Sequence, residues 1–167
     1  MNDKTTLALT VNQRPFNITV EARMTLADAL RDHCGLTGTN SGCEHGVCGT
    51  CTVLIDGQPV RSCLMFAVQA RGKQVRTVEG LAVDGVLHPL QQAFIDHHAL
   101  QCGFCTPGFL MLTVGLIESD PDIGDDDLID ALSSNLCRCT GYQNILRAVR
   151  ATAKQMRAQR SSGRTQP

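Results

Sequence analysis

Apolar and polar residues alternate near the start of the chain, in residues 6–11 and again in residues 16–20. A period of two is typical of strands that bury one face, so these residues predict two antiparallel strands joined at Asn12 and Gln13. We therefore expect a strand pair to open the fold.

Helical spacing follows this hairpin. Leu26, Ala29 and Leu30 repeat at the interval of one helix face, and Thr25 before them is a residue type that caps helix N-termini. Gly35 is the expected stop, because glycine readily adopts the left-handed conformation that ends helices. We predict a short helix of about ten residues here.

Residues 37–50 are rich in glycine and have no periodicity, which predicts a loop whose backbone packs closely against another group. Residues 52–55 and 58–61 then flank Asp56-Gly57, a dipeptide typical of two-residue hairpin turns. Residues 74–78 supply one more strand-like run. Strands and one helix around a glycine-rich loop predict a small α+β domain.

The second half of the chain has a different pattern, in which apolar residues keep helical spacing almost continuously from Pro89 onward. The predicted helices cover residues 90–98, 109–118, 127–136 and 145–156. We therefore predict an α+β domain in residues 1–80, an all-α four-helix domain in residues 81–160 and a flexible tail in residues 161–167.

Composition favours two small domains over one large core. Among the 167 residues fifteen are glycine, five are phenylalanine and one is tyrosine, and small domains with modest cores commonly need a metal centre for stability. The net charge is −1 and the basic residues are scattered until the C-terminal tail. This distribution excludes the basic surface that a nucleic-acid-binding protein needs, so we expect no nucleic acid partner.

The sequence also carries a prediction of location. No apolar stretch is long enough for a signal peptide or a membrane span, so we expect no membrane insertion and a cytoplasmic protein. Thiols stay reduced in the cytoplasm. A cysteine-rich chain is there better explained by metal ligation than by disulfides.

Four of the nine cysteines form a first cysteine group, Cys43, Cys48, Cys51 and Cys63. Their spacing is Cys-x4-Cys-x2-Cys and then eleven residues to the last member, the pattern by which plant-type ferredoxins hold a 2Fe-2S cluster. A zinc site is the alternative, but four-cysteine zinc sites usually combine two Cys-x2-Cys pairs.

Glycines interleave with the first cysteine group, at Gly42, Gly46 and Gly49. Because glycine has no side chain, the backbone N-H groups of this loop can approach a cluster closely and stabilise its negative sulfurs. The same property suits any tight metal loop.

Four more cysteines form a second cysteine group, Cys102, Cys105, Cys137 and Cys139. Its spacing is Cys-x2-Cys, thirty-one residues, then Cys-x-Cys. The two pairs lie beside predicted helix ends, so they are able to meet at one end of a bundle. From spacing alone, zinc suits this group nearly as well as iron and sulfide. The ninth cysteine, Cys34, is interpreted as a small buried apolar residue.

Three segments closely resemble the iron-sulfur subunit of the molybdenum hydroxylases, a family that includes xanthine dehydrogenase, aldehyde oxidoreductase and carbon monoxide dehydrogenase. The segments are residues 42–53 (GCEHGVCGTCTV), 101–108 (QCGFCTPG) and 135–142 (NLCRCTGY). The resemblance extends over nearly the whole chain, and all eight grouped cysteines match.

The resemblance implies a β-grasp ferredoxin-like domain with one 2Fe-2S cluster, followed by a four-helix domain with the other. It implies that Gln101 contacts molybdopterin, that the cofactor is molybdopterin cytosine dinucleotide on a large subunit, and that FAD lies on a medium subunit. A dimer of heterotrimers is the implied assembly.

The implied function is electron transfer, one electron at a time, from the molybdopterin centre through both clusters to FAD. No catalytic residue is expected on this chain, because its glycines follow its cysteines and form no phosphate-binding loop. Two alternatives come from other classes of protein: a stand-alone ferredoxin-type carrier and a zinc-stabilised interaction module.

Overall fold

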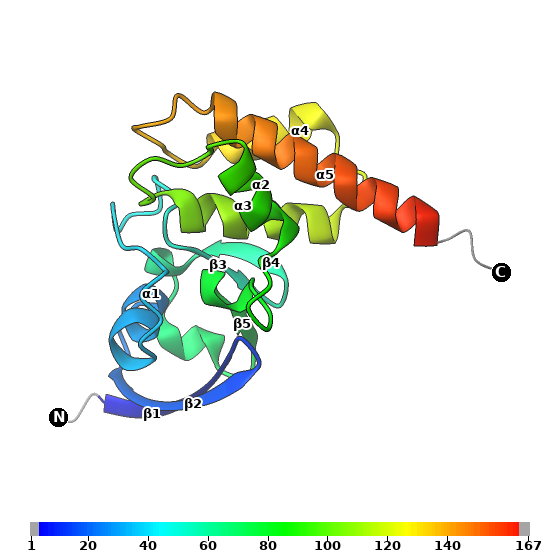
Figure 1. The fold of residues 1–167 in the computed structure, drawn as a ribbon. Coiled ribbons are helices and arrows are strands. Elements are labelled where there is room, and N and C mark those ends of the chain that lie inside the picture. The colour runs from blue at the N-terminus through cyan, green and yellow to red at the C-terminus, as the bar shows by residue number, and fades with distance from the viewer. Residues whose placement is uncertain (1–3, 164–167) are drawn as a thin grey trace.

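The computed structural model describes residues 4–163. A sheet-containing half and a helical half lie against each other, with the sheet half at the bottom of Figure 1 and most of the helices above it. The bundle helix α3 covers the sheet at the boundary.

The first half contains a mixed five-stranded sheet in the order β2-β1-β5-β3-β4. Its strands are β1 (Lys4–Val11), β2 (Arg14–Glu21), β3 (Thr52–Ile55), β4 (Gln58–Arg61) and β5 (Gln74–Arg76). β1 runs parallel to β5, whereas the β1-β2, β3-β4 and β3-β5 pairs are antiparallel. This order, with one helix between the two hairpins, is the β-grasp arrangement that was predicted.

The predicted short helix is present as α1 (Leu26–Asp28), continued by a wider helical turn over Ala29–His33. Thr25 caps it as expected, because its Oγ1 accepts a hydrogen bond from the Asp28 N-H at 3.1 Å. Gly35 follows with φ of +69° and ends the helix.

The β3-β4 hairpin has the bounds that the sequence predicts. Asp56 and Gly57 at its turn have φ of +50° and +84°, as a tight hairpin turn requires. β5 is shorter than predicted and stops at Arg76. The reason lies in the next residue, since the Thr77 N-H bonds to Asn12 Oδ1 at 2.9 Å instead of continuing the sheet.

The helical half contains α2 (Pro89–Asp96), α3 (Thr106–Ser119), α4 (Asp125–Ser133) and α5 (Gln143–Gly163). All four predicted helices are present, with ends that differ from the prediction by a few residues. The largest difference is at α5, which continues past residue 156 through the first residues of the expected tail. Residues 164–167 of that tail lie outside the described residues.

Each half has its own apolar core, and β3 belongs to both. Val53 and Ile55 on one face of β3 pack in the core of the sheet half, whereas Leu54 on the other face packs with the helices. Gly115 of α3 makes room for this contact, because a side chain there would collide with Leu54 and Pro59. The shared strand fixes the two halves against each other.

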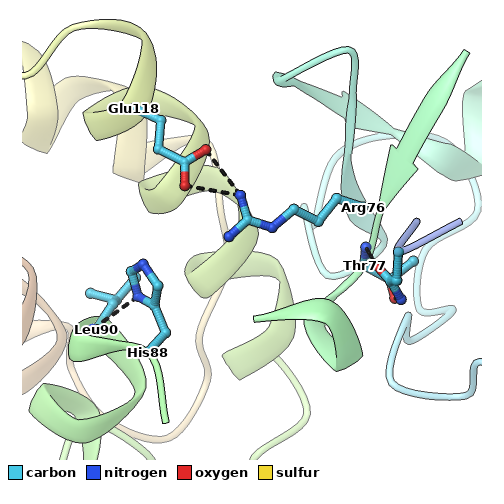
Figure 2. A network of polar contacts seen from close by, with 6 residues as sticks. Arg76, Thr77, His88, Leu90 and Glu118 are labelled. Atoms are coloured by element: carbon cyan, nitrogen blue, oxygen red, sulfur yellow. Dashed lines mark hydrogen bonds and ion pairs between the residues drawn. The ribbon is translucent and has the colours of Figure 1, made fainter. Parts of the chain in front are cut away.

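A polar contact also joins the halves at the edge far from the cysteines. Arg76 at the end of β5 donates to both carboxylate oxygens of Glu118 on α3, at 2.9 and 3.0 Å (Figure 2). Near this pair, His88 caps α2 by accepting a hydrogen bond from the Leu90 N-H through Nδ1 (Figure 2). Within residues 4–163, every helix is too short or too polar to cross a lipid bilayer.

Candidate metal centres

The loops that carry the two cysteine groups lie at the same end of the molecule, at the left of Figure 1. Hydrogen bonds join them. The carbonyl of Phe104, which lies between Cys102 and Cys105, accepts hydrogen bonds from Asn40 Nδ2 at 2.8 Å and from Thr50 Oγ1 at 2.7 Å, both in the glycine-rich loop. The Leu136 N-H donates to the Cys48 carbonyl at 2.9 Å. Residues far apart in sequence therefore form one continuous site region.

In the first cysteine group, Cys43 and Cys48 form one pair. The Cys48 N-H donates to Cys43 Sγ at 3.3 Å. Hydrogen bonds from the backbone N-H groups of Cys48 and His45 lower the pKa of the Cys43 thiol to about 6. A thiol with so low a pKa is largely ionised at neutral pH, which is the form that binds metals.

Cys51 and Cys63 form the other pair of the first group, and both are buried. Cys63 lies in a helical turn over Ser62–Leu64 directly after β4. Burial, with the neighbouring Cys51 thiol, raises the pKa of Cys63 to about 11. Charge on this pair needs compensation by a cation, because two adjacent thiolates repel each other in a desolvated setting.

The three glycines of the first loop lie where the backbone turns tightly. Gly46 and Gly49 have φ of +83° and +74°, a left-handed conformation that favours glycine. A side chain at Gly42 would come within 3.3 Å of Cys48 Sγ. Glycine therefore permits the left-handed backbone at residues 46 and 49 and leaves room beside Cys48 Sγ at residue 42.

The second cysteine group also consists of two pairs. The sulfurs of Cys102 and Cys139 lie 3.5 Å apart and both residues are exposed. Cys105 and Cys137 lie deeper, and burial together with the neighbouring Cys137 thiol raises the pKa of Cys105 to about 12. Burial opposes ionisation of Cys137 as well, yet hydrogen bonds from Thr140 and Cys139 leave its pKa lowered.

Aromatic residues of the bundle hold this second group in place. The Cys137 N-H donates to the hydroxyl of Tyr142 at 3.0 Å. The Tyr142 ring meets Phe109 edge to face, with ring centroids 6.4 Å apart. Phe109 is fully buried in the core of the helical half. The position of Cys137 therefore depends on the packing of the bundle.

The paired thiols fit a 2Fe-2S cluster. Such a cluster has two irons and four protein ligands, two ligands on each iron, and each group offers two pairs of thiols. A zinc ion instead needs four ligands around one point. No three Cys, His, Asp or Glu side chains in residues 4–163 are arranged around a single metal ion.

Two further residues were singled out from the sequence: Gln101, which lies beside the second cysteine group, and Cys34, which lies apart from both groups. Gln101 is exposed on the loop directly before Cys102. Cys34 is partly buried and packs against the core of the sheet half, where burial raises its pKa to about 11. That environment agrees with the interpretation of Cys34 as an apolar residue.

Sequence reasoning missed the residues that connect the two groups. Arg61 of β4 donates to the Ser134 carbonyl and hydroxyl at 3.0 and 2.9 Å, and Asn135 lies buried against Gly49. Asn135 stands in one of the recognised motifs, but nothing in its local pattern indicates a partner more than eighty residues earlier.

Comparison with protein families agrees with two centres. Residues 9–82 match a family described as a 2Fe-2S iron-sulfur cluster binding domain. Residues 77–150 match a second family, described as a 2Fe-2S binding domain. The two matches follow each other in the order of the two cysteine groups.

Individual relatives cover almost the whole chain. The nicotine 6-hydroxylase small subunit of Paenarthrobacter nicotinovorans is 56% identical over 148 residues, which are 89% of each chain. The caffeine dehydrogenase subunit gamma of Pseudomonas sp. (strain CBB1) is 55% identical, over 88% of this chain and 90% of the relative. In the crystal structure of quinoline 2-oxidoreductase from Pseudomonas putida 86, a chain 49% identical superposes with a TM-score of 0.88, covering 94% of this chain and 98% of its own length.

Two domains with paired thiols, each matched by a 2Fe-2S family, define a two-cluster electron-transfer protein. More particularly, the chain belongs to the family of iron-sulfur small subunits of the molybdenum hydroxylases. It is an electron-transfer subunit of an oxidoreductase rather than a complete enzyme, which confirms the family and fold predicted from the sequence. The alternative of a stand-alone ferredoxin finds no support, because these relatives are named as subunits.

Proposed function

We propose that the eight grouped cysteines are the ligands of two 2Fe-2S clusters, with each observed pair on one iron. In the first group the pairs are Cys43 with Cys48 and Cys51 with Cys63; in the second they are Cys102 with Cys139 and Cys105 with Cys137. The pairing of the thiols is the observation that supports this assignment. When bound, each cluster takes up and releases one electron.

The direction of transfer that we propose runs from the second group to the first. Cys102 and Cys139 are exposed beside Gln101, so a molybdenum-binding partner can approach them directly. Electrons then move to the first group and on to FAD in another subunit. Backbone N-H groups around the cysteines tune the reduction potentials of the clusters. Buried apolar residues around the cysteines limit the access of water.

Gln101 is the residue that we propose to contact molybdopterin. Its amide offers two donors and one acceptor oxygen, and its exposure leaves them free to meet a cofactor held by the partner. At the first group, Gly42, Gly46 and Gly49 bring the backbone N-H groups close to the cluster.

Exposed apolar side chains beside each group support two partner subunits. Leu64, next to Cys63, is 64% exposed, and Leu136, next to Cys137, is 50% exposed. Exposed apolar residues gathered around a functional site typically mark an interface. We infer a large molybdenum-binding subunit and a medium FAD-binding subunit, assembled as a dimer of heterotrimers.

We also propose the chemistry of the assembled enzyme. The relatives named above act on nicotine, caffeine and quinoline, so hydroxylation of a nitrogen heteroaromatic ring is the proposed reaction, with molybdopterin cytosine dinucleotide on the partner. The proposed compartment is the cytoplasm, where the eight thiols stay reduced and able to bind metal. The proposed domain boundary is residue 80, between β5 and α2.

The decisive experiment is to isolate the chain together with its partners and to measure iron, labile sulfide and the electron paramagnetic resonance spectrum after reduction. The expected result is two different 2Fe-2S signals per chain, with molybdenum and flavin in the same complex. A single signal, or zinc in place of iron and sulfide, would disprove the assignment.

A further inference from the structure

Three consecutive residues, Ser134, Asn135 and Leu136, lead from the end of α4 to Cys137 of the second group. Each of them meets a residue of the first half of the chain. We call this three-residue segment the junction. Its contacts include a direct hydrogen bond between the backbones of the two cysteine-bearing segments.

Arg61 holds the first residue of the junction. Its guanidinium donates to the Ser134 carbonyl at 3.0 Å and to the Ser134 hydroxyl at 2.9 Å, and it also bonds Thr52 Oγ1. Thr52 directly follows Cys51, and Arg61 lies two residues before Cys63. The guanidinium thus ties the buried pair of the first group to the end of α4.

Asn135 is 1% exposed and lies against the backbone of Gly49. A methyl group at position 49 would collide with the Asn135 amide, so glycine there is needed for the two to meet. Neither Oδ1 nor Nδ2 of Asn135 has a hydrogen-bond partner among the described residues. Burying an amide without hydrogen-bond partners destabilises the fold, and an apolar side chain of similar size would avoid that loss.

The third residue completes the connection. The Leu136 N-H donates to the Cys48 carbonyl at 2.9 Å. One hydrogen bond therefore links a residue of the first cysteine group to the residue that precedes Cys137. A second contact between the groups, Thr50 Oγ1 to the Phe104 carbonyl, passes instead through a side chain.

We propose that electrons pass between the two clusters through the junction and that the junction also sets the distance between the clusters. Asn135 and Arg61 are the positioning residues that hold the junction in place. This inference rests on the function proposed above. One electron leaves the cluster of the second group and one arrives at that of the first; no atom or proton is transferred. The Asn135 side chain serves to place the junction between the two groups rather than to stabilise the fold.

The test uses the assembled enzyme with Asn135→Ala, Asn135→Ser and Arg61→Gln. Three quantities are measured: the intensity of both reduced 2Fe-2S signals, the magnetic splitting that each cluster causes in the other, and the rate of transfer between them after rapid mixing with reductant. Both signals should remain, the splitting should shrink, and transfer should slow about tenfold or more, as is typical when outer-shell partners of a metal site are lost.

Two control variants separate this role from general stability. Arg76→Ala removes a polar link between the halves that involves no residue of either cysteine loop (Figure 2), and should leave splitting and transfer rate at their wild-type values. Thr50→Val removes the side-chain contact and should slow transfer less than Asn135→Ala does.

Several outcomes would overturn the inference. One is wild-type splitting and rate in the junction variants, and another is an effect of Thr50→Val larger than theirs. A third is loss of a cluster in all three variants, because the residues would then be needed to assemble one cluster and not to set the distance between the two. Failure of the proposed function looks different, because the wild-type complex itself would then lack two 2Fe-2S signals.

Discussion

The two cysteine groups are built in opposite ways. Cys43 and Cys48 of the first group lie in one glycine-rich loop, Cys51 directly follows that loop, and Cys63 comes after the next hairpin. The second group is drawn from loops thirty-one residues apart, with α3 and α4 between them. Its deeper pair, Cys105 and Cys137, comes together only when those helices are packed.

The difference teaches which interactions each centre depends on. The first group needs local geometry, namely left-handed glycines and a β-hairpin. The second group needs a correctly packed helical core, reached through Tyr142 and Phe109. Substitutions in the bundle should therefore remove the second centre selectively, and substitutions under the sheet should weaken the first.

Replacing a single ligand should have the largest effect. Cys105→Ala should abolish the second 2Fe-2S signal and electron transfer from substrate to flavin, while the first signal remains. Reduction spectra of the assembled enzyme and steady-state turnover measure both. Cys34→Ala is the matched control and should keep both signals, because Cys34 packs in the sheet core. Turnover that survives in Cys105→Ala would contradict the proposed order of transfer.

Removing a buried ring from the bundle comes next. Phe109→Ala should lower the free energy of unfolding by about 3–5 kcal/mol, since it leaves a cavity in the core of the helical half. During urea titration of the full chain, bleaching of the second centre should then precede that of the first. Leu26→Ala, in the core of the sheet half, is the reciprocal variant. Equal bleaching of both centres in both variants would disprove the selective dependence.

A smaller effect is expected at the tyrosine hydroxyl. Tyr142→Phe leaves the ring against Phe109 but removes the acceptor of the Cys137 N-H. The unpaired N-H should cost about 1–3 kcal/mol and speed amide exchange at Cys137. Hydrogen exchange followed by mass spectrometry measures this, with peptides of the first loop as the internal reference. Unchanged exchange at Cys137 would show that the hydroxyl is dispensable.

The smallest effect should come from the helix cap in the sheet half. Thr25→Ala removes the acceptor of the Asp28 N-H and should cost about 1 kcal/mol. The urea concentration that bleaches the first centre should fall slightly, and that of the second centre should stay constant. Thr25→Ser keeps the acceptor and should behave as wild type. If Thr25→Ala shifted the bleaching midpoint of the second centre more than that of the first, the helix would not support the first centre as proposed.

Local structure was predictable where one short signal decides it. Asp56-Gly57 predicted the β3-β4 hairpin, because both residue types adopt the left-handed conformation that a two-residue hairpin turn with φ > 0 at both positions requires. Thr25 predicted a helix start because its hydroxyl can accept a hydrogen bond from a backbone N-H of the first helical turn. β5 was predicted too long, since the side chain of Asn12, sixty-five residues away, binds the Thr77 N-H that would have continued the strand.

The cysteine groups were also predictable, because ligand spacing is written in the sequence. Their mutual placement was not. The contact of Asn135 with Gly49 and the contact of Arg61 with Ser134 depend on how a helix end meets a sheet loop, and no periodicity or motif encodes such a meeting. The order of strands in the sheet came from resemblance for the same reason.

The fit of Asn135 against Gly49 limits how such subunits can be recombined. A chimaera that joins the sheet half of one homologue to the helical half of another inherits its two contact residues from different parents. Only parents that share both the glycine and the asparagine would give a chimaera with the original contact, so two positions far apart in the gene have to be exchanged together.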